Sequence, residues 1–479
     1  MNTMKKIAAL AVISVMIASL LALSAGAVFE TDFADLKFTL IGQTLGGVNM
    51  IDDDVLLYGQ YCMRGFTVST DGKYAFGGYL NPGNTSAVAR FNLETGHADA
   101  YYQYAQTEGS SVGTVSYPKG LDCDDRGYLY VGLAYNPNKI RAYFAILDYE
   151  TVKDDMMKEV SVTSVFYDEA NTKIGVNGLK VRNIDGKYYC YIILNYDEDY
   201  LYRYDVTTPE TPVLDKTFGT DGRVDIQKLT VASGAFADCN YLDIGDDGAI
   251  YIAYKSSGGA GLAKLSADGN TVLTNVEQTK GYGVCIVDDY VLCSGQSSPC
   301  EIVVYSMLDL SKVTSFAITE QNTVLPYPES YDLAYVDPIN SIVTMRYYGG
   351  VLYLADQGSS SGDLDQIFAV GLTDEGKTKV AATAAVLEAN AKALNEETTA
   401  ESTIHVIDPP TQPEETTAAA EPEATTAPEE VTTAGDIAAP ETTATPTEKK
   451  GCKSSAVAAA VIPTLAMLGC APVFIRRKH

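Results

Sequence analysis

One short unit recurs along this 479-residue chain and restricts its fold more than any other feature. Each copy is an alternating strand, a turn rich in Asp and Gly, and a second strand rich in Val, Ile and Tyr. Two such strands joined by such a turn are typical of a tight β-hairpin. The copies are GFTVSTDGKYAFGG from Gly65, GLDCDDRGYLYVG from Gly120, GLKVRNIDGKYYCYI from Gly178 and YLDIGDDGAIYIAY from Tyr241, with weaker copies GVCIVDDYVLCSG from Gly283 and VTMRYYGGVLYLAD from Val343.

A third strand follows each hairpin after a polar loop, as in SAVARFNL, IRAYFAILDY and YLYRYDV. A fourth strand is expected after turns such as those at residues 95–96 and 268–269. Units of about 40 to 60 residues that each form a four-stranded sheet predict an all-β fold, a β-propeller. Six blades are visible, and the stretch from Phe38 to Tyr58 either closes the ring or contributes to a seventh blade. The alternative, tandem β-sandwich modules, needs longer repeats.

The blade-length stretch KGLDCDDRGYLYVGLAYNPNKIRAYF resembles a blade of the NHL, YVTN and gluconolactonase-type propellers. In those families a glycine opens the inner strand, and an Asp/Gly turn precedes the next one. The resemblance extends over most of the region from Gly65 to Leu372. It implies the fold and leaves the activity open, because propellers carry many unrelated functions.

The two ends of the chain indicate export and anchoring. Residues 1–27 have the basic start, apolar run and small-x-small site of a secretory signal peptide, the alternative being an uncleaved anchor. Residues 451–479 contain an apolar run of about twenty residues, enough to span a bilayer as a transmembrane helix. The basic residues 476–478 that follow predict a cytoplasmic C-terminus. This end resembles the C-terminal anchors of Gram-positive surface proteins, although the sortase pentapeptide is absent.

Composition divides the rest of the chain into three parts. Residues 28–374 form the predicted propeller. Residues 375–395 form a predicted amphipathic helix that docks on it, because apolar residues recur there at helical spacing. Residues 396–450 are rich in Thr, Pro, Ala and Glu, have too few large apolar side chains to fold, and predict a disordered stalk. The apolar residues of the helix are Val380, Ala384, Leu387, Ala391 and Leu394.

Several classes of function are disfavoured by composition. With 34 Lys and Arg against 62 Asp and Glu, the net charge of −28 argues against nucleic acid. Propeller lyases that use a metal need clustered histidines, and a Ser-His-Asp site needs a partnered one, whereas the repeats contain only His97. Sialidase and quinoprotein propellers use Trp motifs, and the chain has no Trp. We therefore expect no catalytic residue, no cofactor and no metal ligand.

The resemblance leaves one enzymatic alternative, a divalent-cation-dependent hydrolase or lyase of the lactonase type. Such enzymes hold the cation in the central channel through acidic and amide side chains. In this chain Asn177, Asn240 and Asp332 lie near the starts of inner strands, although no Glu occupies the matching positions. Among the cysteines, only Cys293 and Cys300 flank a loop suited to a local disulfide, and that pairing is left open.

Strand direction assigns the connections to two faces of the ring. Hairpin turns lie on one face, and loops between second and third strands lie on the other. Asp and Gly in the turns are explained by positive φ, and LDCDDRGYLYVG lacks the ligand pattern of an EF-hand, so we expect no ligand there. The loops are rich in Tyr, Asn and Asp, which suit sugars or protein surfaces. The predicted ligand-binding residues are Tyr79, Asn81, Asn84, Tyr135, Asn136, Asn138, Tyr196, Asp197, Asp199 and Tyr200.

Together these features predict a secreted β-propeller that is anchored in the cell membrane by its C-terminal helix and displayed outside the cell. Its predicted role is the non-catalytic binding of extracellular carbohydrate or protein. The ligand and the oligomeric state do not follow from the residues.

Overall fold

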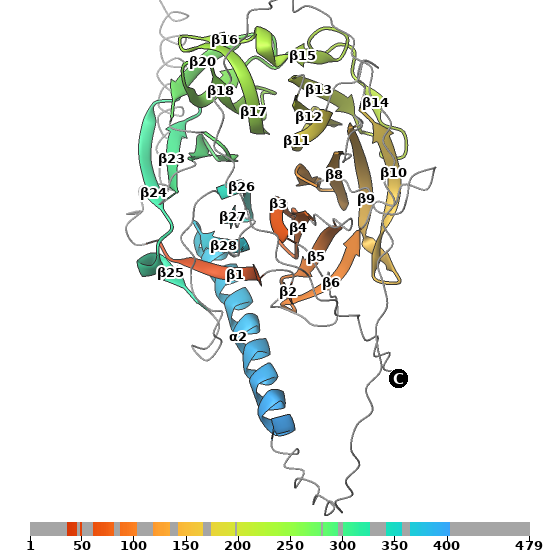
Figure 1. Cartoon of the computed structure of the whole chain (residues 1–479), viewed down its shortest axis with the longest axis vertical. Coiled ribbons are helices and arrows are strands. Elements are labelled where there is room, and N and C mark those ends of the chain that lie inside the picture. The colour runs from red at the N-terminus through yellow and green to blue at the C-terminus, as the bar shows by residue number, and fades with distance from the viewer. Residues whose placement is uncertain are drawn as a thin grey trace, which may run out of the picture. The chain divides into compact units, whose positions relative to one another are not determined.

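The computed structural model describes residues 36–45, 48–49, 61–80, 87–102, 118–134, 142–165, 174–196, 199–278, 281–295, 300–325, 342–356 and 365–402. These residues form antiparallel sheets arranged as blades around a central axis (Figure 1). Six blades are present in the described part of the chain, which confirms the predicted propeller.

The first three blades follow the repeats in chain order. Blade 1 contains β3 (Tyr61–Val68), β4 (Tyr74–Leu80), β5 (Ala87–Asn92) and β6 (His97–Tyr102). Blade 2 contains β7 (Leu121–Cys123), β8 (Tyr128–Ala134), β9 (Ala142–Lys153) and β10 (Met156–Ser164). Blade 3 contains β11 (Ile174–Ile184), β12 (Lys187–Tyr196), β13 (Tyr200–Asp205) and β14 (Val213–Leu214), with β15 (Arg223–Asp225) also paired to β13.

The other three blades complete the ring. Blade 4 contains β17 (Gly234–Ile244), β18 (Ile250–Ser256), β19 (Ala260–Leu265) and β20 (Val272–Glu277), with β16 (Thr230–Val231) at its edge. Blade 5 contains β21 (Val284–Val287), β22 (Tyr290–Ser294), β23 (Glu301–Ser306) and β24 (Lys312–Ala317). Blade 6 contains β26 (Ile342–Tyr348), β27 (Val351–Asp356), β28 (Asp365–Gly371) and β1 (Phe38–Leu45), to which β2 (Val48–Asn49) and β25 (Thr323–Val324) pair. Two 3₁₀ helices, η3 (Ile226–Lys228) and η4 (Glu320–Asn322), lie in connections.

The ring is closed by the N-terminal strand. β1 pairs antiparallel with β28, and its register sets Thr39 opposite Ala369, so strands from both ends of the repeat region share blade 6. Phe38 and Leu40 are fully buried between blades 5 and 6. Each such side chain contributes about 1.5–3 kcal/mol when it is buried. Of the two roles that the sequence leaves open for this segment, ring closure is therefore the one observed.

The first strands of the blades surround the central channel. β3, β7, β11, β17, β21 and β26 each contact the next in a closed circle. Apolar residues fill the space between neighbouring sheets, as where the rings of Phe236 and Tyr254 stack at 4.4 Å. The predicted turn chemistry is also confirmed at the hairpin of blade 3, where Asp185 and Gly186 have φ of 52° and 81°. Two consecutive positive φ values match the twist of a two-residue hairpin.

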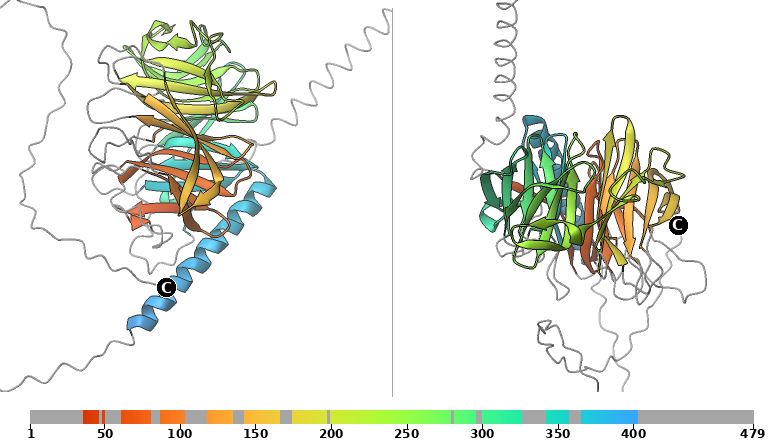
Figure 2. Two further views of the ribbon diagram at one scale, coloured as in Figure 1. Left: turned by 90° about the vertical axis from the view of Figure 1, so that its right-hand side faces the viewer. Right: turned by 90° about the horizontal axis from the view of Figure 1, so that it is seen from above.

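Helix α2 (Asp374–Ser402) follows the last blade and lies against it, in blue in Figure 2. Val380 and Leu387 are buried in the apolar cluster of blades 1 and 6, and Asn390 Nδ2 donates to the Thr95 carbonyl at 2.7 Å. The helix begins where predicted but continues beyond residue 395, to Ser402, in the segment predicted as stalk. Segments 1–27, 403–450 and 451–479 lie outside the described residues. Within the described part, no helix has the length and hydropathy of a membrane span.

The described cysteines act as small core residues. The six cysteines whose side chains are described are buried and unpaired, including Cys293 and Cys300, so the disulfide that the sequence left open is not formed in this structure. Burial raises the pKa of the Cys293 thiol to about 12 and that of Cys300 to about 11. Protonated thiols of this kind are unreactive at neutral pH.

Candidate functional site

One residue from each inner strand faces its neighbours near the middle of the channel. In blades 1 to 5 it lies two positions after the residue that opens the repeat, and in blade 6 it lies three positions after Val343. The strand pairing shows that these positions are equivalent, because each one pairs with an aromatic or aliphatic residue in the second strand of its blade. We call this set the channel ring: Thr67, Asp122, Lys180, Asp243, Cys285 and Arg346.

The charged members of the channel ring form a buried network. Asp122 lies 3.2 Å from Arg346 Nε and 3.6 Å from Lys180 Nζ. Lys180 also lies 3.3 Å from Asp243. All four side chains are at most 6% exposed. Two acids and two bases therefore neutralise one another in the interior, where an unpaired charge is costly.

Backbone groups complete this network and join further blades to it. The Val181 N–H donates to Asp122 at 2.8 Å, and the Ile286 N–H donates to Asp243 at 2.9 Å. Arg346 donates to the Leu121 carbonyl at 2.6 Å. Burial opposes ionisation of Asp243, but Lys180 and the Ile286 N–H together hold the pKa of its carboxyl below its ordinary value. The centre of the propeller is therefore fixed by charge-assisted contacts between blades.

The three aspartates of LDCDDRGYLYVG have three different environments. Asp122 belongs to the channel ring. Asp124 accepts from the N–H groups of Arg126 and Tyr128 at 2.9 and 3.2 Å, and so stabilises the hairpin turn. Asp125 is exposed and accepts from the Tyr188 hydroxyl at 2.6 Å. The stretch forms the predicted hairpin: Asp124 lies in its turn, whereas Asp122 lies in its first strand, β7, and holds blades together, a role that was not predicted.

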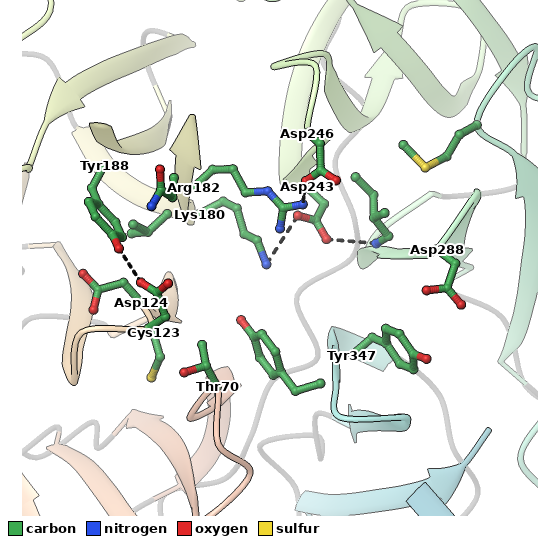
Figure 3. A pocket seen from close by; sticks show the side chains of 16 residues that line it. Thr70, Cys123, Asp124, Lys180, Arg182, Tyr188, Asp243, Asp246, Asp288 and Tyr347 are labelled. Atoms are coloured by element: carbon green, nitrogen blue, oxygen red, sulfur yellow. Dashed lines mark hydrogen bonds and ion pairs between the residues drawn. The ribbon is translucent and has the colours of Figure 1, made fainter. Parts of the chain in front are cut away.

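A cavity of about 490 Å³ lies next to the channel ring, on the face that carries the hairpin turns. We call it the turn-end cavity (Figure 3). Lys180 and Asp243 line its base. Its sides come from the hairpin turns of several blades and from the turn that follows β23. The residues that line its sides include Cys123, Asp125, Arg182, Tyr188, Asp246, Asp288, Met307 and Tyr347.

The two sides of the cavity differ in how their charges are satisfied. Arg182 forms an ion pair with Asp246. Tyr188 donates to Asp125, and the guanidinium of Arg126 lies 3.6 Å from the centre of the Tyr188 ring. Asp288, on the opposite side of Figure 3, makes no hydrogen bond or ion pair with the described residues. Burial and the neighbouring Asp289 raise the pKa of the Asp288 carboxyl.

The loop end of the channel is closed by Tyr241. This side chain extends from blade 4, and its hydroxyl donates to the Arg64 carbonyl of blade 1 at 2.8 Å. Blades 1 and 4 face each other in a ring of six, so the tyrosine crosses the channel. It is 6% exposed and packs edge to face on Tyr282. The turn-end cavity is therefore separated from the loop face.

The loop end also contains the asparagines of the lactonase-type alternative. Asn177 Oδ1 accepts from Lys119 Nζ at 2.8 Å, and Asn177 Nδ2 donates to Asn240 Oδ1 at 3.0 Å. Both amide oxygens thus already face N–H groups, and Asp332 lies outside the described residues. Burial and the nearby Arg64 lower the pKa of Lys119 to about 8. In the described part of the chain, no three His, Cys, Asp or Glu side chains are grouped as metal ligands.

Four of the predicted ligand-binding residues can be located. Tyr79 is 3% exposed and packs in the core of blade 1. Tyr196 ends β12. Asp199 is buried, which raises its pKa to about 6. Tyr200 is half-buried and stacks on Arg223 at 4.4 Å. Asp199 and Tyr200 thus lie together in blade 3, apart from Tyr79, and their role in binding stays a prediction. The remaining residues, Asn81, Asn84, Tyr135, Asn136, Asn138 and Asp197, lie outside the described residues.

Sequence reasoning missed the channel ring although its signal is present. When the six repeats are aligned by their strand pairing, with the repeat from Val343 shifted by one residue, one column reads Thr, Asp, Lys, Asp, Cys and Arg. Four charged residues at one inward position of an otherwise apolar strand indicate mutual pairing. The Asp and Gly residues of the turns that follow have a structural explanation of their own, and Asp122 was grouped with them.

Comparison with known proteins confirms no family. No protein-family model matches the chain, and no curated protein matches it in sequence. Similar solved structures include the Dos1 propeller (11% identity over 71% of this chain and 85% of that chain, TM-score 0.39). BamB from Moraxella catarrhalis matches at 10% identity over 70% and 94%, with a TM-score of 0.36.

The dihydro-heme d1 dehydrogenase NirN matches at 12% identity over 54% of this chain, with a TM-score of 0.33. The chain spans 57% of the length of NirN. Similarities at these scores carry no inference about ligand or activity. The chain is a β-propeller, and its function has to be argued from its own site.

Proposed function

We propose that this propeller is a non-catalytic binding module whose ligand enters the turn-end cavity. One observation carries the proposal: a cavity of about 490 Å³ lies over a base of interlocked ion pairs. Small-ligand sites have volumes of about 300–1,000 Å³. Because blades 2, 3, 4, 5 and 6 all contribute to the network at the base, the site is organised before a ligand binds, which lowers the entropic cost of binding.

The reactive side chains of the cavity are held in unreactive states. Burial, Asp122 and Asp124 raise the pKa of the Cys123 thiol well above its ordinary value, so the thiolate nucleophile is disfavoured. Lys180 lies between two carboxylates, 3.6 Å from Asp122 and 3.3 Å from Asp243, and is already engaged in ion pairs with both. The cavity therefore offers hydrogen bonds and charge, as binding requires, and no activated nucleophile from these two groups.

The chemistry of the cavity suits a polar ligand. Tyr188 and Tyr347 supply aromatic surface with a hydroxyl, and Arg182 and the aspartates supply directional hydrogen bonds. Extracellular carbohydrate and protein side chains both fit such a lining. The proposal includes secretion through residues 1–27 and anchoring through residues 451–479, which set the propeller outside the cell. Kinship with the NHL, YVTN and gluconolactonase-type propellers, and a contact surface formed by the predicted loop residues, are also parts of the proposal.

A comparison of variants tests where the ligand binds. The full-length chain is screened against a glycan array and a peptide array, and each hit is titrated against Tyr347→Ala and the double variant Tyr135→Ala/Tyr196→Ala. The matched control is Tyr101→Ala, at an outer strand of blade 1 far from the channel. We expect Tyr347→Ala to weaken binding about tenfold or more, and Tyr101→Ala to leave it unchanged. Loss in the Tyr135 and Tyr196 variant alone would assign binding to the loop face and refute the cavity.

A further inference from the structure

We propose that the turn-end cavity recognises a cationic side chain, Lys or Arg, of a protein partner, with Asp288 and Tyr347 as the recognition pair. This inference rests on the proposed function and specifies its ligand. Three observations support it: the charge balance of the cavity, the environment of Asp288, and an exposed apolar side chain at the rim.

The cations around the cavity are already neutralised by the protein. Each has its own carboxylate within ion-pair distance: Lys180 with Asp243, Arg182 with Asp246, Arg126 with Asp124, and Arg346 with Asp122. Two carboxylates of the lining, Asp125 and Asp288, have no such cation in the described part of the chain. Asp125 accepts from the Tyr188 hydroxyl. The cavity therefore carries an excess of negative charge. Asp288 is the carboxylate of the lining that has neither a cation nor a hydrogen-bond donor among the described residues.

Asp288 is placed to receive a cation. It lies in the hairpin turn between β21 and β22, with φ of 50°, and Asp289 follows it. Partial burial and the like charge of Asp289 both disfavour its ionised form. Tyr347 lies on the same side of the cavity, close enough that Asp288 raises the pKa of its hydroxyl, after the larger effect of burial. A cation between them would gain both a carboxylate partner and an aromatic face.

The rim indicates that the cation belongs to a protein. Met307 lines the cavity, and the next residue, Leu308, is 85% exposed, the most exposed large apolar side chain of the described residues. This turn is held in place, because the Met307 carbonyl accepts from Tyr251 and Lys264, each at 3.1 Å. An exposed leucine in a turn whose backbone is held in place, next in the chain to a residue that lines a charged cavity, suits a partner that presents an apolar residue next to its Lys or Arg. A sugar or a small free amine would leave Leu308 uncovered.

The test uses three heptapeptide libraries that differ only at their fixed central residue, which is Lys, Arg or norleucine. Binding to the full-length chain is measured by fluorescence anisotropy. We expect the Lys and Arg libraries to yield binders whose affinity falls as salt is raised, and the norleucine library to yield none. Asp288→Asn should weaken the best binder about tenfold or more, because it removes the charge and keeps the shape. Asparagine also tolerates the positive φ of this turn, so the variant keeps the fold.

The matched control is Asp289→Asn, which makes the same change of net charge one residue away and outside the cavity lining. It should leave the affinity within about twofold of the parent chain. Leu308→Ser should weaken peptide binders that carry an apolar neighbour and leave the salt dependence unchanged.

The outcomes separate this inference from the proposed function. Equal binding of Lys and norleucine libraries, or equal loss in Asp288→Asn and Asp289→Asn, overturns the cationic inference. If only glycans bind, and Tyr347→Ala weakens them, the cavity is a ligand site and the protein-partner inference is wrong. If no glycan or peptide responds to Tyr347→Ala, both the inference and the proposed function fail.

Discussion

The two ends of the channel use the same six inner strands and differ in both access and charge. At the turn end, short hairpins surround a cavity in which the carboxylates of Asp125 and Asp288 have no cation partner among the described residues. At the loop end, Tyr241 crosses the channel, and the charges around Lys119 are those of Arg64, Asp238 and Lys255. The channel ring separates them. Among the described residues, one side chain therefore crosses the channel at the loop end, and the carboxylates without a cation partner line the cavity at the turn end.

The largest expected effect comes from breaking the channel ring between the two ends. Asp122→Ala would leave Arg346 without its carboxylate and Lys180 with one partner fewer, all in the buried interior. Removing one partner of a buried ion pair costs about 3–5 kcal/mol of the free energy of unfolding, measured by urea denaturation. Asp125→Ala, three residues later and exposed, should cost less than about 1 kcal/mol. Equal costs would contradict the different roles of these two aspartates.

A pair of tyrosine variants compares the ends directly. Tyr241→Ala removes a buried ring and opens the loop end, and large-to-small changes of this kind cost about 3–5 kcal/mol. Tyr347→Ala, at the half-buried side of the cavity, should cost about 1 kcal/mol. Thermal unfolding of both variants checks the difference. A larger loss for Tyr347→Ala would mean that the cavity side, and not the closed end, holds the ring together.

The pH dependence of stability reports on the loop end. The pKa of Lys119 falls from 10.5 to about 8 on folding, so between these values the unfolded chain holds a proton that the folded chain has lost. Stability contributed by this group therefore rises as pH increases from about 8 towards 10. Lys119→Met lacks the titration, and the Tm of the parent chain should rise relative to that of the variant over pH 7.5–9.5. A constant difference in Tm would show that Lys119 keeps an ordinary pKa.

The smallest expected effect concerns Asp288 in the absence of ligand. Its folded pKa is raised, so the ionised carboxylate destabilises the folded state at neutral pH, and this penalty is relieved as pH falls through the folded pKa. Asp288→Asn should therefore raise the free energy of unfolding at pH 7 by less than about 1 kcal/mol, with a smaller gain at pH 4. A variant that is less stable than the parent chain at pH 7 would mean that Asp288 already has an internal partner.

The repeated hairpins made the propeller fold predictable from the sequence, but they did not predict the turn-end cavity. Repeated hairpins specify blades because each strand, turn and register is a local feature, and Asp185-Gly186 behaves as its composition indicates. Most of the channel ring was readable from aligned repeats, since Asp122, Lys180 and Asp243 occupy one column and Arg346 lies one residue beyond it. The closure of the loop end by Tyr241 could not be predicted from the sequence. Tyr241 contacts Arg64, 177 residues away, and only the curvature of the ring brings blade 4 opposite blade 1.

The loop residues illustrate the same limit. The ring and hydroxyl of Tyr79 are chemically suited to ligand binding. The residue is nevertheless only 3% exposed, because it packs within blade 1 beside Gly77. Composition reports what a side chain can do, and burial decides whether a ligand can reach it. The acidic residues of the turns show the reverse case. Their presence is explained by turn structure, so no ligand was expected there, and yet they line the cavity.

Hydrogen–deuterium exchange of the full-length chain, with and without the best-binding peptide or glycan, tests the site most directly. If the turn-end cavity binds the ligand, exchange should slow at the turns around residues 124–126, 183–188, 286–290 and 346–350. Exchange around residues 79–80, 135–139 and 195–200 should stay unchanged. Slower exchange in the second set alone would assign the ligand to the loop face and contradict a site in the turn-end cavity.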